Sequence, residues 1–131
     1  MSDFSSLIKT ADAKAEKHVP VIDAGTSWKA GQAQVVTVTV GKDIPHPNTT
    51  AHFISWIELY FKPAAGGPVI NLGRAEFSAH GESAQGVDQG IAHTDPVFTT
   101  SVKLGASGTL LALSYCNLHG LWQSSKDITV A

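Results

Sequence analysis

Residues 51–61 read AHFISWIELYF, and this stretch decides the fold class. In a β-strand, successive side chains point to opposite faces of the sheet. Here both sets of alternate residues are largely apolar, which is typical of a strand covered on both sides. The stretch therefore predicts a central strand, with Trp56 as a core residue.

Several other short stretches have the composition of strands. Residues 34–40 (QVVTVTV) alternate Val and Thr and are rich in β-branched residues. Residues 62–67 (KPAAGG) form a predicted turn. Further strands are predicted at residues 69–77, 97–104, 109–115 and 127–130. Residues 109–115 are ambiguous by periodicity, but their brevity and the glycines before them favour a strand.

The expected fold is all-β, an immunoglobulin-like β-sandwich, because many short strands are separated by Gly and Pro. The first fifteen residues are expected to form a short helix, capped by Ser2 or Ser5, or an extended segment. No repeat, low-complexity tract or linker interrupts the 131 residues, so a single domain spanning residues 1–131 is expected.

Composition narrows the function classes. Cys116 is the only cysteine, so no disulfide can form within the chain, which fits a reducing compartment or a metal or redox role. No stretch approaches the roughly 20 apolar residues of a membrane span, and the N-terminus lacks a secretory signal pattern. We therefore expect a cytoplasmic protein with no membrane association. The net charge is -2 and no basic block is present, which argues against nucleic-acid binding.

Four clusters of polar or reactive residues stand out, and each is expected in a loop or at a strand end. They are EKHVP at 16–20, HPN at 46–48, His52, and CNLHG at 116–120. A single buried cysteine usually behaves as a small hydrophobe, and a single histidine is usually structural. His80 and His93 have no motif around them and are expected to be surface-loop residues.

Taken together, the clusters predict a metal site. Cys116 and His119 form a Cys-x2-His pair in a predicted tight turn, in which backbone N–H groups could point at the sulfur. One thiolate among imidazoles favours a redox ion, whereas structural zinc sites usually carry paired cysteines. Adding His18, His46 and His52 gives five ligands and leaves one position of a six-coordinate ion open.

Two other functions fit parts of the pattern. A blue-copper electron carrier can combine a β-sandwich with a C-terminal Cys-x2-His loop. The only methionine is Met1, far from that loop, although Gln123 could replace it as axial ligand. A metal-free binding sandwich could use Trp28 or Trp122, but Trp122 follows His119 closely and is expected to shield the metal loop.

The three motifs, in this order, resemble those of the superoxide reductases, and most closely their one-iron form, neelaredoxin. The resemblance runs from Glu16 to Trp122. The two-iron relatives, the desulfoferrodoxins, carry an additional N-terminal domain with an iron bound by four cysteines. This chain has no such cysteines, so only the catalytic iron is expected.

The resemblance implies an immunoglobulin-like β-sandwich that holds one mononuclear non-haem iron ion per chain, cycling between Fe²⁺ and Fe³⁺. Its implied ligands are four equatorial histidines, His18, His46, His52 and His119, the axial thiolate of Cys116, and Glu16 as sixth ligand of the oxidised site. Lys17 is implied as the cationic residue beside the open position.

The implied reaction is the one-electron reduction of superoxide to hydrogen peroxide, which detoxifies superoxide. Lys17 would draw the anion to a protein whose overall charge is slightly negative. The resemblance also implies an external electron donor, rubredoxin or a similar small protein. Apolar edge strands make a homodimer or a homotetramer the expected assembly.

Overall fold

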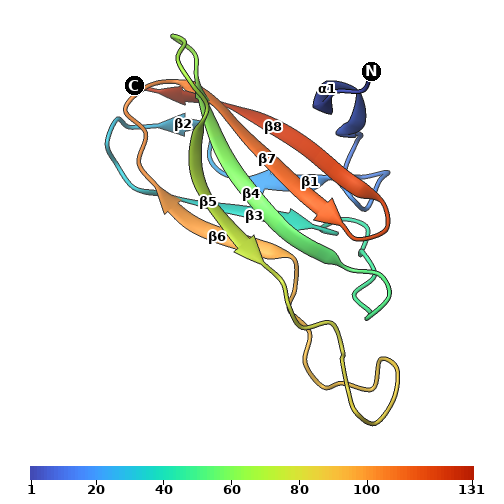
Figure 1. Ribbon diagram of the computed structural model, residues 1–131. Coiled ribbons are helices and arrows are strands. Elements are labelled where there is room, and N and C mark those ends of the chain that lie inside the picture. The colour runs from blue at the N-terminus through green and yellow to red at the C-terminus, as the bar shows by residue number, and fades with distance from the viewer.

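The structure is a computed structural model that describes residues 1–131. It contains one short helix and eight strands (Figure 1). These elements are α1 (Phe4–Leu7), β1 (Pro20–Asp23), β2 (Ser27–Trp28), β3 (Gln34–Val40), β4 (Ile54–Pro63), β5 (Ile70–Glu76), β6 (Val97–Val102), β7 (Gly108–Cys116) and β8 (Gly120–Val130).

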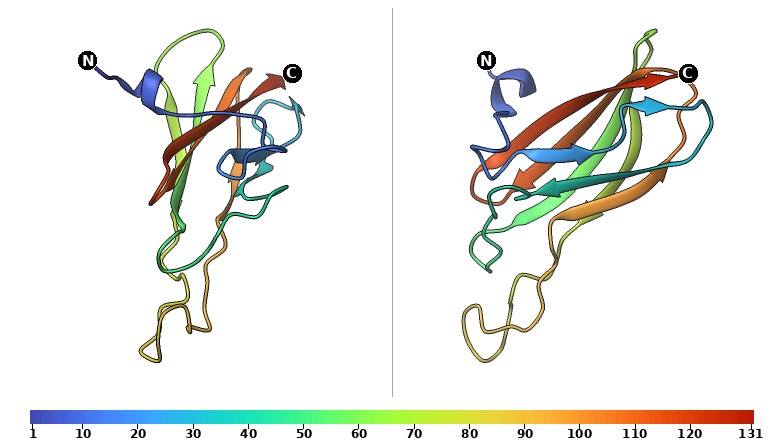
Figure 2. Two further views of the ribbon diagram at one scale, coloured as in Figure 1. Left: turned by 90° about the vertical axis from the view of Figure 1, so that its right-hand side faces the viewer. Right: turned by 180° about the vertical axis from the view of Figure 1, so that it is seen from behind.

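The strands form two facing sheets, which the edge-on view of Figure 2 shows as separate layers. One sheet has the order β1-β3-β6, and the other has the order β2-β8-β7-β4-β5. All pairs are antiparallel except β2 with β8. The predicted immunoglobulin-like β-sandwich is thus confirmed.

Strands with clear alternation were predicted well, whereas strands without it were missed. The range predicted for β3 matches its observed bounds, and β5, β6 and β7 lie within two residues of prediction. The four-residue β1 and the two-residue β2 are too short to show a period. β8 begins at Gly120, seven residues before the expected start, because its polar residues between Gln123 and Asp127 mask the pattern.

The predicted short N-terminal helix is present, but its predicted cap, Ser2 or Ser5, is wrong. Only the four residues of α1 are helical, and Asp3 caps them by accepting a hydrogen bond from the Ser6 backbone N–H. Four residues give a single turn, so the helix has little stability of its own. No helix in the structure is long and apolar enough to cross a bilayer.

A β-bulge in β4 overturns the prediction that Trp56 is a core residue. The register against β7 shifts between Ile54 and Trp56, so the inward-facing residues change from even to odd numbers. Trp56 therefore lies half-buried on the outer face. Its ring stacks on that of Tyr115 at a centroid distance of 5.8 Å, and the Arg74 guanidinium carbon lies 4.6 Å from the Trp56 ring centroid.

The core lies between the two sheets and extends to the end of β7. Alternate residues of β7 point inward, and the last of them is Cys116, whose side chain is 0% exposed. The alternation of side chains along β7 thus places a buried thiol at one end of the sandwich. The inward residues of the central strands β4 and β7 include Ile57, Leu59, Leu110 and Ala112.

Leu59 is fully buried in β4, so Leu59→Ala should lower the free energy of unfolding by about 2–5 kcal/mol, through lost apolar burial and a residual cavity. Equilibrium unfolding in urea measures this change. Val35→Ala, at a β3 position that is 63% exposed, is the matched control and should cost under about 1 kcal/mol. Equal losses in the two variants would contradict the assignment of the core.

Candidate metal centre

The predicted site residues come together at one end of the sandwich, the right-hand end in Figure 1. β1 and β4 begin at this end, and β3 and β7 end there. His18 precedes β1, and His46 and His52 lie between β3 and β4. Cys116 is the last residue of β7, and His119 lies in the turn to β8.

Four of the five predicted ligands form a tight cluster. The Nδ1 atom of His119 lies 3.1 Å from Nε2 of His18, 3.2 Å from Nε2 of His52 and 3.6 Å from Sγ of Cys116. The four ligand atoms all lie within 4.8 Å of one another. Their number and chemistry fit a borderline or redox-active transition ion, which favours imidazole and thiolate donors.

His46 completes the ring of imidazoles. Its ring centroid is 4.8 Å from that of His18 and 4.6 Å from that of His52. Nδ1 donates to the Pro47 carbonyl at 2.6 Å, which leaves the lone pair on Nε2. That Nε2 is the one buried side-chain nitrogen or oxygen of the protein without a hydrogen-bond partner. An unpaired buried polar atom costs about 1–3 kcal/mol, so this atom itself points to a ligand.

Outer contacts orient His18. Its Nδ1 bonds the Glu16 carboxylate at 2.7 Å, which directs the other ring nitrogen at His119. The Trp122 indole stacks on the His18 ring at 5.0 Å and 14°, and its Nε1 donates to the His119 carbonyl at 3.3 Å. Trp122 therefore covers the cluster on one side. Such partners fix which nitrogen of a histidine faces a metal.

Asn117 joins the turn after Cys116 to the segment that carries His52. Its backbone N–H donates to the Phe53 carbonyl at 3.1 Å, and its Oδ1 accepts from the Phe53 N–H at 2.9 Å. No backbone N–H contacts the sulfur, so that expectation is wrong. Within this turn, the Asn117 N–H bonds Phe53, the residue before β4, instead.

Gly41 allows the chain to turn from β3 toward His46. Its φ is +85°, and a Cβ at this position would lie 2.7 Å from the His46 backbone nitrogen. Only glycine satisfies both the conformation and the close approach. The sequence GKDIPH therefore places His46 beside the end of β3.

Burial favours the neutral form of three histidines of the site, His18, His46 and His52. Desolvation lowers the pKa of His46 to about 4 and also lowers the pKa of His18 and of His52. For His18, the hydrogen bond with Glu16 opposes this shift. At neutral pH these three imidazoles thus have free lone pairs, which metal binding requires.

Lys17 and Glu16 flank the cluster. Lys17 is half-buried and forms no salt bridge, and its positive charge contributes to lowering the pKa of Glu16, His18, His46 and His52. The hydrogen bond with His18 is the largest cause of the low pKa of Glu16. The Glu16 carboxylate lies against His18 and not among the four clustered ligand atoms, so its role as sixth ligand stays a prediction.

His80 is buried, so the expectation that it is a surface-loop residue is wrong, whereas His93 is exposed as expected. His80 is only 3% exposed and stacks on Phe53 at 3.8 Å. A polar residue in a segment rich in Gly and Ser gives no sequence signal of burial. The buried position depends on contacts with residues far away in the chain.

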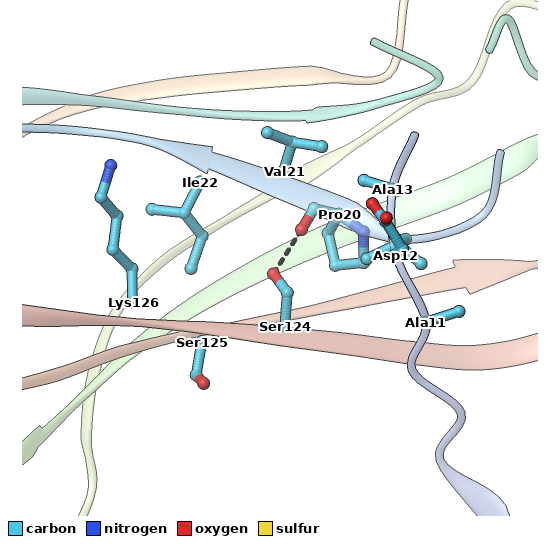
Figure 3. A pocket seen from close by; sticks show the side chains of 10 residues that line it. Ala11, Asp12, Ala13, Pro20, Val21, Ile22, Ser124, Ser125 and Lys126 are labelled. Atoms are coloured by element: carbon cyan, nitrogen blue, oxygen red, sulfur yellow. Dashed lines mark hydrogen bonds between the residues drawn. The ribbon is translucent and has the colours of Figure 1, made fainter. Parts of the chain in front are cut away.

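The largest hollow, about 350 Å³, lies elsewhere, between β1 and β8 (Figure 3). Ala11–Ala13 lie at one end of it, and the Ser124 hydroxyl donates to the Pro20 carbonyl across it. None of the predicted ligands lines this hollow, so the candidate centre is the histidine and cysteine cluster.

Comparisons with known proteins agree with this geometry. The family model described as Desulfoferrodoxin matches residues 10–125. The superoxide reductase of Pyrococcus furiosus is 48% identical over 125 residues, covering 95% of this chain and 98% of the relative. A solved structure from Thermotoga maritima has a TM-score of 0.96 and 54% identity, covering 100% of this chain and 99% of that one.

A second solved structure is the superoxide reductase (neelaredoxin) from Archaeoglobus fulgidus in the reduced form. It has a TM-score of 0.87 and 49% identity, covering 94% of this chain and 98% of that one. Both the family model and these relatives span most of the chain, and the motif residues lie within the matched range. The chain therefore belongs to the desulfoferrodoxin family, in its superoxide reductase (neelaredoxin) group.

Proposed function

We propose that this chain is a superoxide reductase that holds one iron ion per chain and converts superoxide to hydrogen peroxide. The observation that carries the proposal is the convergence of three imidazole nitrogens and the Cys116 sulfur, together with the unpartnered Nε2 of His46. His18, His46, His52, His119 and Cys116 would hold the iron. When bound, the iron supplies one electron, which with two protons turns superoxide into hydrogen peroxide.

The donor set supports iron over copper. A blue-copper site uses two histidines, one cysteine and a weak axial ligand, usually methionine. Here a third clustered imidazole and the buried nitrogen of His46 would be left without a role. The only methionine is Met1, at the exposed N-terminus.

Lys17 is the residue that would bring the substrate in. Superoxide is an anion, and the protein carries a net charge of -2, so attraction must come from a local positive field. No carboxylate pairs with the Lys17 ammonium, so its charge is not neutralised by a neighbour. Its N–H groups could also hold a water molecule that delivers a proton to the product.

Glu16 would have two roles at different stages of the cycle. In this structure it bonds Nδ1 of His18 and so fixes the ring orientation. We propose that it also binds the oxidised iron as a sixth ligand and leaves when the iron is reduced. The electron would come from rubredoxin or a similar small redox protein in the cytoplasm, and the chain would assemble as a homodimer or a homotetramer.

Iron analysis paired with stopped-flow measurement of superoxide consumption tests the proposed function. We expect about one iron per chain, rapid loss of superoxide with a reduced donor, and no dioxygen formed. Cys116→Ala and Cys116→Ser should abolish both the thiolate-to-iron absorption band and the activity. Copper in place of iron, dioxygen release, or variants that keep band and activity would contradict the assignment.

Lys17→Ala should slow the reaction with superoxide by about tenfold at low salt, because the local attraction is lost. The rate of this variant should also depend less on ionic strength. Salt screens the attraction between Lys17 and superoxide, and the variant lacks that attraction. Lys14→Ala removes a more exposed lysine nearby and is the control, expected to change little. If the Lys17 and Lys14 variants behave alike, Lys17 has no special role in attracting the anion.

Glu16→Ala should shift the absorption spectrum of the oxidised iron protein and leave the rate of the first reaction with superoxide within a few fold. The spectrum and the iron dissociation constant should be measured together. A weaker iron affinity with an unchanged oxidised spectrum would show that Glu16 acts only on His18.

A further inference from the structure

The long segment between β5 and β6, residues 77–96, is built around a buried histidine outside the metal cluster. His80 is 3% exposed, and it is one of three buried polar side chains in the protein, with His18 and Ser114. Figure 1 shows this segment extending from the same end of the sandwich as the 41–53 connection, which carries His46 and His52.

His80 holds the side chain of Asn48, which follows the ligand His46 by two residues. With its proton on Nδ1, His80 donates to Oδ1 of Asn48 at 2.9 Å, and its Nε2 lies 2.9 Å from the Phe77 carbonyl oxygen. The Asn48 amide also donates from Nδ2 to the Thr94 carbonyl at 3.1 Å. Both ends of this amide are therefore fixed by the 77–96 segment.

The same ring supports the second ligand of the connection. His80 stacks on Phe53, the residue after His52, at a centroid distance of 3.8 Å and an angle of 14°. Phe53 in turn exchanges two backbone hydrogen bonds with Asn117, the residue after Cys116. One buried ring thus contacts the neighbours of two ligands and, through Phe53, is linked to a third.

The 77–96 segment has the internal bonds needed for a rigid support. The Thr94 N–H donates to the Ala79 carbonyl at 2.7 Å, and the Gly90 N–H donates to the Gly81 carbonyl at 2.8 Å. Asp88 accepts two hydrogen bonds from Thr50, both at 2.8 Å. Asp88 is the only non-glycine residue with a positive φ, 58°, so the backbone adopts an uncommon conformation where it contacts the ligand connection.

We propose that His80 is a positioning residue of the metal centre: it fixes the orientation of the His46 and His52 imidazoles through Asn48 and Phe53. The inference rests on the proposed iron site and assigns no contact between His80 and the iron. Removing a group that hydrogen-bonds a metal ligand directly typically lowers metal affinity about 10–100-fold, and His80 acts on the ligands through one intervening residue, so an effect at the lower end is expected.

The test uses the full iron-loaded chain, with chelator competition to measure the iron dissociation constant and absorption to record the thiolate-to-iron band. His80→Ala should bind iron about tenfold more weakly and shift the band. His93→Ala is the matched control in the same segment, since His93 is exposed, and should leave both unchanged.

Asn48→Ala breaks the same link without removing the buried ring, and it decides the question if His80→Ala does not fold. Asn48→Ala, like His80→Ala, should bind iron more weakly than the unmodified chain. The double variant should lose less than the two single losses combined, because both residues act through one contact. Unchanged affinity and band in Asn48→Ala and His80→Ala would overturn the inference, even if both variants melt earlier. An unmodified chain that takes up no iron would instead overturn the proposed function.

Discussion

The convergence of imidazole nitrogens on the buried sulfur of Cys116 is the constraint on which this end of the molecule depends. The sulfur is placed by strand periodicity, since Cys116 is the last inward residue of β7 and pairs with Ile54 of β4. The histidines come from three connections that meet there because both sheets end at that point. The core and the candidate centre are thus continuous, and the same pairing of β4 with β7 positions both.

The interior of the site and its rim differ in charge. Burial lowers the pKa of three histidines and keeps their lone pairs available, while Glu16 bonds the outward nitrogen of His18. Lys17 is half-buried beside them and has no carboxylate partner. Neutral imidazoles with an unpaired cation beside them suit a small anionic substrate, whatever the overall charge of the protein.

The residues of the candidate site could be predicted from the sequence because they occur in compact motifs, and the two-layer fold followed from strand alternation. The outward position of Trp56 could not be predicted, since one bulged residue changes which alternate residues of β4 point into the core. The burial of His80 was also missed, because its partners Asn48 and Phe53 are about 30 residues away in the chain. The local sequence pattern indicates strand periodicity and turn residues. β-Bulges and hydrogen bonds between residues far apart in the chain depend on packing.

His18 and His119 are 101 residues apart in the chain, yet their ring nitrogens lie 3.1 Å apart. An ion held between them would close a loop that contains nearly every strand, much as a long-range disulfide restricts an unfolded chain. Such a cross-link can be opened by protons or chelators without breaking a covalent bond. Metal binding and folding of the whole sandwich would then be thermodynamically linked. Conditions that remove the ion would therefore also lower the stability of the fold.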